Sequence, residues 1–363
     1  MSMSHKLKTY HLSHIDLDGY SCQLVTHELF ENISFFNANY GPEVGTRLRE
    51  ILSLIDASNE PCNILVTDLN LTLDESKFID RMVKERNEAG KEVNLLLLDH
   101  HGSGQESADI FDWYVLDVKR CATKIVYEYA LEHWDISADL QKWMTPYVAI
   151  VNAVDIWLMD EYENFEYGKV CLRLVSESRE LNRYIFDDED RKYKFSLLKK
   201  AALMSDTENA AIELDEKIHS MKKSFFMDDK NNTLDGLATD YIVKLIGLYK
   251  EKFTIYFRGH KGILTYSLGN TSIVGNGILR ANDDVDFMID VGGRGTLSLR
   301  ADNKFNVSIL AKELAGGGGH PNASGGRLKN FKDKYIYEEV KEYFEGLLSE
   351  IESKSKIPLL DTH

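Results

Sequence analysis

The sequence predicts an α/β protein in which a doubly wound, mainly parallel sheet is followed by a smaller α/β domain. Strand-like and helix-like hydrophobic periods alternate through the first half of the chain, as they do in such sheets. The leucine-rich segment 93–98 has the nearly continuous apolar character of a strand buried on both faces. A turn-rich stretch at 228–236 separates this half from a second set of β-rich segments. With 363 residues, 43% of them hydrophobic, the chain is long enough for two cores.

The individual elements follow from these periods. In the first half, strands are expected at 8–14, 32–39, 62–68 and 93–98, and helices at 21–30, 43–57, 74–89 and through most of 123–203. In the second half, strands are expected at 253–258, 263–267, 285–290 and 296–301, and helices at 306–315 and from about 335. We therefore expect domains at 1–195 and 237–363, joined by a helical linker at 196–236.

The net charge of the chain argues against one class of function. The formal net charge of −16 argues against binding of long duplex nucleic acid, because that binding depends on Lys and Arg side chains that neutralise phosphates. Residues 241–330 depart from the average, with twelve Lys and Arg against seven Asp and Glu. This segment either serves a small anionic substrate or reflects ordinary scatter of surface charge.

Composition also indicates the cellular setting. No run of 18 apolar residues occurs, and the N-terminus lacks the apolar core of a secretion signal. The cysteines Cys22, Cys62, Cys121 and Cys171 lie far apart without a C-x-x-C pair, so neither a zinc finger nor a disulfide framework is expected. We expect a soluble, cytoplasmic protein with no membrane partner.

Four groups of acidic and histidine residues carry the strongest chemical signal. The groups are His14, Asp16 and Asp18 before Gly19; Asp68; Asp99, His100 and His101; and Asp155. Three follow predicted strands, whose carboxyl ends meet at the sheet edge where α/β proteins place their chemistry. A single acid at such a place is often a turn or cap residue. An EF-hand is excluded because Val25 would occupy the twelfth ligand position. Together the groups predict a two-metal site.

The third group suggests a division of roles. Successive side chains point in different directions, so His100 can bind a metal ion while Asp99 holds its other ring nitrogen. His101 is then free to face the substrate and to act in catalysis.

A second signal lies downstream, where a run of glycines ends at His320. Without Cβ atoms, the backbone N–H groups of Gly317, Gly318 and Gly319 can approach a phosphate as an anion-binding nest, with His320 as a donor at its rim. The alternative is a helix C-cap that leads into a flexible linker.

Together the two signals resemble the DHH phosphoesterase superfamily, with its DHH and DHHA1 domains, over about residues 8–326. The acid and histidine groups match the family's four metal motifs. Residues 316–325 match its GGGGH-x-x-A-x-G motif, although Ser324 stands where a second alanine is frequent. The opening His-Ile-Asp-Leu-Asp-Gly looks closest to the B-type oligoribonucleases, the nano-RNases B.

The resemblance implies roles for individual residues. One ion would be held by His14, Asp16, Asp68 and Asp155, and the other by Asp18, Asp68 and His100, so that Asp68 bridges the pair. Arg300 resembles the family's phosphate-contacting arginine, Arg294 is a second candidate, and the active site is expected in the interdomain cleft. Oxygen-rich ligands with two imidazoles favour Mn²⁺, with Co²⁺ or Mg²⁺ as substitutes and zinc not excluded.

Such a metal pair hydrolyses phosphorus esters by in-line displacement. The chain lacks the length for the OB-fold of long single-strand exonucleases, and it lacks the spans of membrane-anchored relatives. The resemblance therefore implies an exoribonuclease that degrades short oligoribonucleotides to mononucleotides. The alternatives are a phosphatase or phosphodiesterase for 3',5'-bisphosphorylated adenosine or linear dinucleotides, and an RNA-binding module without catalysis. A homodimer is compatible with the sequence.

Overall fold

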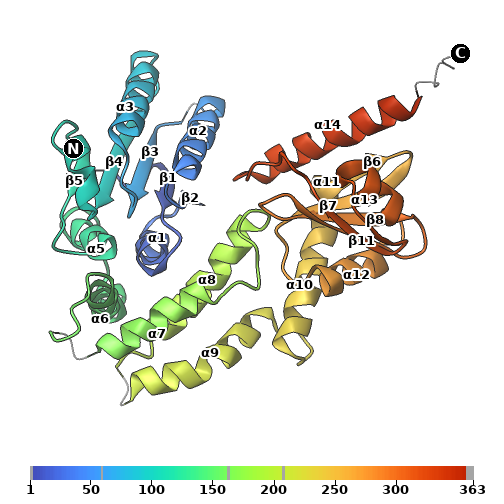
Figure 1. Cartoon of the computed structure of the whole chain (residues 1–363). Helices are drawn as coiled ribbons and strands as arrows, with labels where there is room; N and C mark the ends of the chain where they lie inside the picture. The colour runs from blue at the N-terminus through green and yellow to red at the C-terminus, as the bar shows by residue number, and fades with distance from the viewer. Residues whose placement is uncertain (1–2, 59, 162–163, 207–208, 357–363) are drawn as a thin grey trace, which may run out of the picture. The chain divides into compact units, whose positions relative to one another are not determined.

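The structure, a computed structural model, describes residues 3–58, 60–161, 164–206 and 209–356. The chain divides into two compact units, one of Met1–Ser178 with Arg191–Lys222 and one of Arg179–Asp190 with Lys223–His363. Helices α8 (Asp187–Ala202) and α9 (Ala210–Phe226) each cross a boundary between the units (Figure 1). The functional division at residues 195 and 236 stays a prediction.

The first unit contains a five-stranded parallel sheet with the strand order β2-β1-β3-β4-β5. Its strands are β1 (Lys8–Ser13), β2 (Ile33–Asn37), β3 (Cys62–Thr67), β4 (Val93–Asp99) and β5 (Tyr114–Leu116). The helices that precede α8 are α1 (Leu17–Leu29), α2 (Pro42–Ala57), α3 (Leu73–Glu88), η1 (Gly102–Gly104), α4 (Gln105–Ala108), α5 (Ala122–His133), α6 (Ala138–Asp155) and α7 (Phe165–Ser176).

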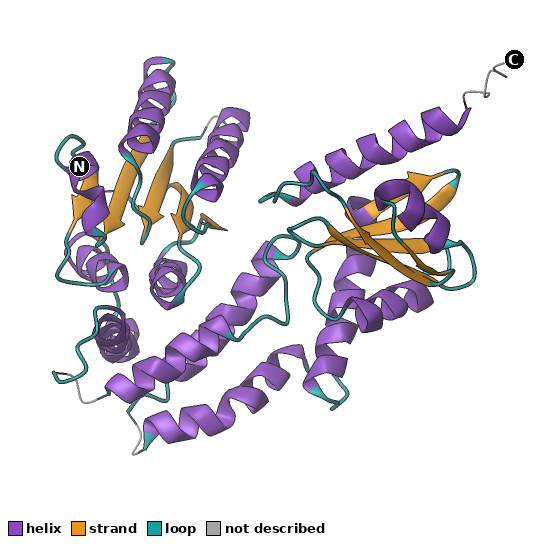
Figure 2. Cartoon of the chain, viewed as in Figure 1, coloured by secondary structure: helices purple, strands orange, loops and turns teal. Residues whose placement is uncertain are grey.

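Helices cover both faces of this sheet (Figure 2). One core cluster joins β1, β3 and β4 to α2 and α3, and includes Leu48 and Ile64. The opposite cluster joins β3 and β4 to α1, α5 and α6, and includes Leu65 and Val126. All six residues of β3 are buried, as expected for a central strand covered on both sides. The doubly wound α/β fold predicted from the sequence is confirmed.

The strand order reverses between β1 and β3. After β1 the chain moves outward to the edge strand β2, and it then returns to β3 on the other side of β1. At such a reversal the loops at the carboxyl ends of the two strands diverge and leave a crevice where ligands bind. Because His14 follows β1 and Asp68 follows β3, the fold places both residues at this point.

The second unit contains a six-stranded mixed sheet with the order β10-β11-β9-β8-β7-β6, in which β7 and β8 pair in parallel. Its strands are β6 (Thr254–Phe257), β7 (His260–Tyr266), β8 (Phe287–Val291), β9 (Thr296–Ala301), β10 (Gly318–His320) and β11 (Ala323–Arg327). The helices that follow α9 are α10 (Leu234–Leu248), α11 (Lys250–Phe253), α12 (Thr271–Ala281), α13 (Val307–Ala315) and α14 (Tyr337–Lys356). No helix in the described part of the chain has the length and hydrophobicity to cross a membrane.

A buried carboxyl in this second unit makes its stability depend on pH. Asp290 on β8 accepts hydrogen bonds from Thr265 Oγ1 at 2.7 Å and from Leu268 N at 3.0 Å. Burial raises the pKa of Asp290 to about 6, although these hydrogen bonds oppose the shift. The folded-state pKa therefore lies above the unfolded value of 3.8. The free energy of unfolding should fall as the pH rises through this interval and then level off.

Asp290→Asn is expected to remove this fall. The amide keeps an acceptor oxygen but carries no charge. At about pH 7 the free energy of unfolding of the variant should therefore exceed that of the wild type by up to about 3 kcal/mol, with no such gain near pH 4. Urea unfolding of both proteins across this range measures the difference. A constant difference at every pH would contradict a raised pKa at Asp290.

Candidate metal centre

The first unit brings the six predicted metal ligands into one cluster. His14 follows β1, Asp16 and Asp18 stand at the start of α1, Asp68 follows β3, His100 follows β4, and Asp155 ends α6. His100 Nε2 lies 3.4 Å from Asp68 Oδ1, 3.5 Å from Asp155 Oδ2 and 3.7 Å from Asp18 Oδ2. His14 Nδ1 lies 2.9 Å from Asp16 Oδ2 and 3.8 Å from Asp68 Oδ2.

The turn from His14 to Gly19 is held by helix capping. Asp16 is the N-cap of α1 and accepts a hydrogen bond from Gly19 N at 3.0 Å. A Cβ at Gly19 would lie 2.4 Å from His14 O, so only glycine lets the first helical turn pack against that backbone. Burial alone would raise the pKa of Asp16, but hydrogen bonds from His14 and Gly19 lower it to about 2. This carboxylate is therefore ionised and able to bind a cation.

Asp18 is oriented by a helix that is distant in the sequence. Its carboxylate oxygens accept hydrogen bonds from Ala122 N and Thr123 N, each at 2.8 Å, at the start of α5. Thr123 Oγ1 also donates a hydrogen bond, to the backbone oxygen of Asp18, at 2.8 Å. Because a helix N-terminus stabilises an anion, these contacts fix the Asp18 carboxylate beside His100.

Asp68 has an uncommon backbone conformation. Its φ of +54° lies in the left-handed region, which costs about 1 kcal/mol or more for a residue other than glycine. The residue is buried, and its Oδ2 has no hydrogen-bond partner among the described residues. Burial raises the pKa of Asp68, and the neighbouring carboxylates add to the rise. Backbone strain and an unpaired buried oxygen at one residue indicate a functional constraint.

Asp155 is also in an unfavourable position without a bound cation. It is the last residue of α6, where the negative end of the helix dipole disfavours a carboxylate. Burial, with the charges of Asp18 and Asp16, raises its pKa to about 8. Its Oδ2 finds no hydrogen-bond partner in the part of the chain that is described.

These donors fit a divalent metal centre. Three overlapping groups of possible ligands are His14, Asp16 and Asp68; Asp18, His100 and Asp155; and Asp68, His100 and His101. Asp68 and His100 each belong to two of these groups, and of the two only Asp68 presents two oxygens, toward His100 and toward His14. A bound cation would also give a partner to the buried Asp68 Oδ2 and Asp155 Oδ2, which make no hydrogen bond with described residues. The resemblance assigns Asp155 to the ion of His14 and Asp16, whereas the structure groups it with Asp18 and His100.

The structure places Asp99 against His101 and not, as expected from the sequence, against His100. His101 Nδ1 lies 2.8 Å from Asp99 Oδ1, and Tyr114 Oη donates to Asp99 Oδ2 at 2.9 Å. The ring of His101 contacts the Asp99 carboxylate, while the ring of His100 is directed at the acidic cluster. Burial lowers the pKa of His101, but its bond to Asp99 and the nearby carboxylates outweigh burial, so the pKa is raised overall.

Tyr40 contacts the cluster, although no motif in the sequence predicts this. Its Oη lies 2.9 Å from His101 Nε2, and its ring packs against the His14 ring with centroids 4.5 Å apart. It therefore connects the His14 loop to the His101 loop. Its position just after the predicted strand 32–39 was the available signal, because that strand ends at the same edge of the sheet.

The glycine run of the second unit is ordered and leads into a hairpin. Gly316 has a φ of +61° and is the C-cap of α13. A Cβ at Gly317 would lie 2.1 Å from Gly325 O, and Gly319 has a φ of +145°. Folding therefore explains these three glycines without a ligand. Gly318 has no positive φ, and an added Cβ there would meet no atom within 4 Å. Close approach of a ligand to the backbone would explain this fourth glycine.

Strand register aligns His320 with Arg300. His320 on β10 pairs with Ala323 on β11, which pairs in turn with Arg300 on β9. Opposite residues of antiparallel strands point to the same face, and two strand spacings separate His320 from Arg300 by roughly 10 Å. Gly318 lies two positions before His320 and shares this face. Arg294 lies in the turn between β8 and β9, at the other end of β9.

Comparison with known proteins identifies the family. Residues 273–354 match the DHHA1 domain. Over 346 residues the chain is 43% identical to the 3',5'-cyclic-nucleotide phosphodiesterase of Helicobacter pylori (strain ATCC 700392 / 26695), and the match covers 94% of this chain and 99% of that protein. The chain belongs to the DHH/DHHA1 phosphoesterase superfamily. This confirms the family resemblance seen in the sequence.

The fold agrees with this membership in the DHH/DHHA1 superfamily. The crystal structure of an uncharacterized protein from Helicobacter pylori G27 matches with a TM-score of 0.89 and 43% identity, over 94% of this chain and 99% of that one. The glycine hairpin, Arg294 and Arg300 lie within the DHHA1 match, and the acid and histidine cluster lies outside it. As a DHH/DHHA1 protein, the chain is a hydrolase of the phosphodiesterase class.

Proposed function

We propose that this DHH/DHHA1 protein is a two-metal phosphodiesterase that hydrolyses short oligoribonucleotides to mononucleotides. The observation that carries the proposal is the cluster of four carboxylates and two imidazoles at the reversal point of the parallel sheet, with two buried carboxylate oxygens that lack a hydrogen-bond partner among described residues. Ordinary caps and turns do not account for buried, unpaired carboxylate oxygens.

The roles of the individual side chains follow from this cluster. When bound, two divalent ions would lower the pKa of a water molecule and neutralise charge on the phosphoryl group. Asp68 would be the ligand common to both, since its Oδ1 lies 3.4 Å from His100 Nε2 and its Oδ2 lies 3.8 Å from His14 Nδ1. His101 is held at Nδ1 by Asp99, and its Nε2, which contacts Tyr40 here, would donate to the phosphate in place of that contact rather than bind a metal ion.

The donor set supports Mn²⁺ as the native metal. Carboxylate oxygens with imidazole nitrogens and no thiolate favour Mn²⁺, while Co²⁺ and Mg²⁺ are suitable substitutes. The four cysteines of the chain are all buried and none belongs to the cluster.

The second unit, which contains the DHHA1 match, would bind the substrate. Arg300 and His320 share one face of the sheet, where a guanidinium and an imidazole can both donate hydrogen bonds to phosphate. The Gly318 backbone on the same face would approach the nucleotide closely, with Gly317 and Gly319 providing the hairpin geometry.

The glycine hairpin allows a matched pair of substitutions. Gly318→Ala is expected to leave thermal stability unchanged but to lower kcat/KM about tenfold or more, because the added methyl group meets no protein atom but would displace a ligand. Gly317→Ala should instead lower the melting temperature, because its Cβ overlaps Gly325 O. Thermal unfolding and steady-state kinetics of both variants provide the comparison. Unchanged kinetics in Gly318→Ala would argue against a ligand at this backbone.

A second candidate substrate is a 3',5'-cyclic nucleotide. The relative that is 43% identical over nearly its whole length carries the name 3',5'-cyclic-nucleotide phosphodiesterase. Oligoribonucleotides and cyclic nucleotides contain the same 3',5'-phosphodiester bond. Cleavage between phosphorus and O3' yields a 5'-monophosphate from either, so one metal centre can serve both.

The values of kcat/KM for a set of substrates distinguish the two candidate functions. We expect kcat/KM with Mn²⁺ to be highest for RNAs of about two to five nucleotides and to fall toward about twenty, because the acidic chain gains little from additional phosphates. The same assay includes 3',5'-cyclic nucleotides, linear dinucleotides and 3',5'-bisphosphorylated adenosine, each at two salt concentrations. A higher kcat/KM for the cyclic nucleotide would replace the leading proposal with the second. Binding without turnover of any substrate would indicate an RNA-binding module.

A further inference from the structure

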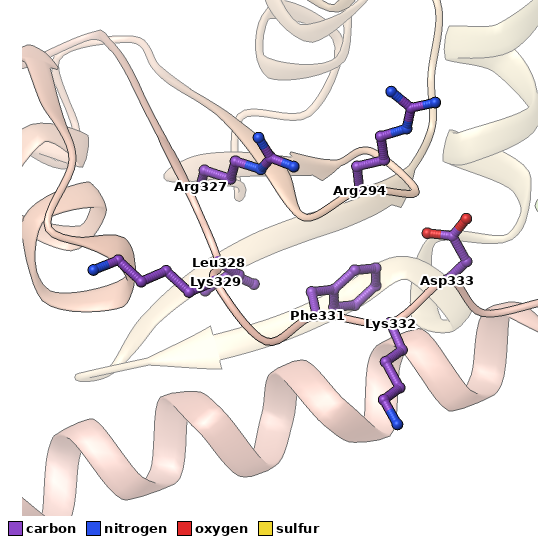
Figure 3. Close-up of a pocket in the computed structure, with 7 residues that line it drawn as sticks. All are labelled: Arg294, Arg327, Leu328, Lys329, Phe331, Lys332 and Asp333. Atoms are coloured by element: carbon purple, nitrogen blue, oxygen red, sulfur yellow. The ribbon is translucent and has the colours of Figure 1, made fainter.

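The second unit also contains a cavity whose lining does not include the glycine hairpin. This cavity of about 650 Å³ lies between the β8–β9 turn and the segment that follows β11. The lining residues that matter here are Arg294, Arg327, Lys329, Phe331, Lys332 and Asp333 (Figure 3). The volume falls within the range of small-molecule sites.

The charge of this cavity is strongly positive. Arg294, Arg327, Lys329 and Lys332 line the cavity together with a single carboxylate, Asp333, and none of the four cations has an ion pair or side-chain hydrogen bond within the described ranges. Elsewhere in the same unit cations do find partners. Arg258 pairs with Glu313, and Lys250 and Lys261 both pair with Asp284. Four unpaired cations around a concavity raise the local concentration of anions.

The two arginines are held in place by the backbone. Arg327 on β11 pairs with Thr296 on β9, and Leu328 N donates to Gly295 O at 2.9 Å. Gly295 has a φ of +77°, and a Cβ there would lie 2.7 Å from Leu328 O. The β8–β9 turn is thereby packed directly against the start of the segment after β11. Arg294 and Arg327 thus lie on the same side of the cavity without any need for a loop to close (Figure 3).

An aromatic ring forms the opposite side of the cavity. Phe331 is half-buried, and its ring contacts those of Tyr343 and Phe344 on α14 with centroids 5.4 Å and 6.4 Å away. These contacts hold the ring in position, and Figure 3 shows it facing the side that carries Arg294 and Arg327. A fixed aromatic ring beside arginines is the combination that binds a nucleobase together with its phosphate.

This cavity is distinct from the site of Arg300 and His320. Arg300 is paired with Ala323, whereas Arg327 is paired with Thr296, four residues away along the same two strands. Four residues of strand correspond to roughly 13 Å. Neither Arg300 nor His320 lines the cavity, and the Arg300 guanidinium donates to Leu299 O and Ser272 Oγ at 2.9 Å and 2.7 Å.

We infer that the cavity binds a nucleotide, with its phosphate at Arg294 and Arg327, its base against Phe331, and a ribose hydroxyl or base amine donating to Asp333. Lys329 and Lys332 add positive charge at its rim. The ligand is either a free mononucleotide or the distal nucleotide of an oligonucleotide. Binding of a free nucleotide does not depend on the function proposed above, whereas binding of a distal nucleotide rests on it.

Calorimetric titration with 5'-AMP tests this inference in the full-length chain carrying His320→Ala, which weakens the hairpin site. We expect saturable binding there, and a further Arg327→Glu change should weaken it about tenfold or more. Arg280→Glu is the matched control, since Arg280 is exposed in the same unit and does not line the cavity; it should change the affinity less than about twofold. Equal affinities in the Arg327 and Arg280 variants, or no 5'-AMP binding once His320 is replaced, would overturn the inference.

Two further measurements define the ligand. Inorganic phosphate should bind more weakly than 5'-AMP by about fivefold or more, and Phe331→Leu should abolish that advantage. Equal affinities for phosphate and 5'-AMP in the parent chain would overturn the base contact. If Arg327→Glu raises KM for a tetranucleotide but not for a dinucleotide, the ligand is the distal nucleotide of the substrate. If neither KM changes, the ligand is a free nucleotide.

Discussion

Asp68→Asn is expected to lower kcat by more than about 100-fold while the protein stays folded. A change next to a metal ligand typically costs 10- to 100-fold, so loss of a ligand shared by two ions should cost more. Asparagine also tolerates the left-handed backbone at this position, so the φ of +54° remains accessible. Steady-state kinetics at saturating Mn²⁺, together with circular dichroism, measure both parts of this expectation.

The stability of the same variant gives a second readout. Without metal, Asp68→Asn should unfold at the same temperature as the wild type or higher, because the buried carboxyl that repels its neighbours is gone. Added Mn²⁺ should raise the melting temperature of the wild type much more than that of the variant. Near-wild-type turnover in this variant would remove Asp68 from the metal centre. Loss of fold without metal would show that Asp68 has a structural role instead.

His101→Ala is expected to lower kcat by roughly 10²- to 10⁴-fold while the metal content of the protein stays unchanged. The metal content should not change because the nitrogens of His101 contact Asp99 and Tyr40, whereas His100 faces the carboxylates. The rate should fall because Nε2 is the donor that would pass from Tyr40 to the phosphate. Tyr40→Phe is the milder companion, because it keeps the ring against His14 and removes the hydroxyl. If metal analysis shows an ion lost with His101, the assignments of His100 and His101 must be exchanged.

The fold and most of the cluster could be predicted because their signals are local. The strands of the first unit show continuous apolar runs, and a strand that ends in Asp or His places that side chain at a known edge of a parallel sheet. Asp68 and His100 are both found in this way. Asp155 is assigned as a metal ligand through the family resemblance, because it lies in a helical stretch and not after a strand. The structure shows that it is the last residue of α6.

Contacts between distant segments could not be predicted. The bonds from Ala122 and Thr123 that orient Asp18 come from a helix more than 100 residues away, and no periodicity links the two segments. The pairing of Asp99 with His101 instead of His100 depends on a ring orientation that spacing alone does not determine.

The glycine run illustrates the same limit. Its four residues look equivalent in sequence, but the hairpin register gives three of them a structural role and leaves Gly318 without one. Arg300 and Arg294 are both candidates for phosphate binding in the sequence. The structure places Arg294 just before β9 and Arg300 near the end of that strand.

If two metal ions share Asp68, each chain must bind two ions, and this number can be measured. The chain is stripped with chelator, reconstituted with Mn²⁺, freed of excess metal and analysed for bound metal and turnover in parallel. We expect two ions per wild-type chain, activity that appears with the second ion, and fewer than two ions in Asp68→Asn. Full turnover by a wild-type chain that holds no metal or a single ion would contradict the two-metal account.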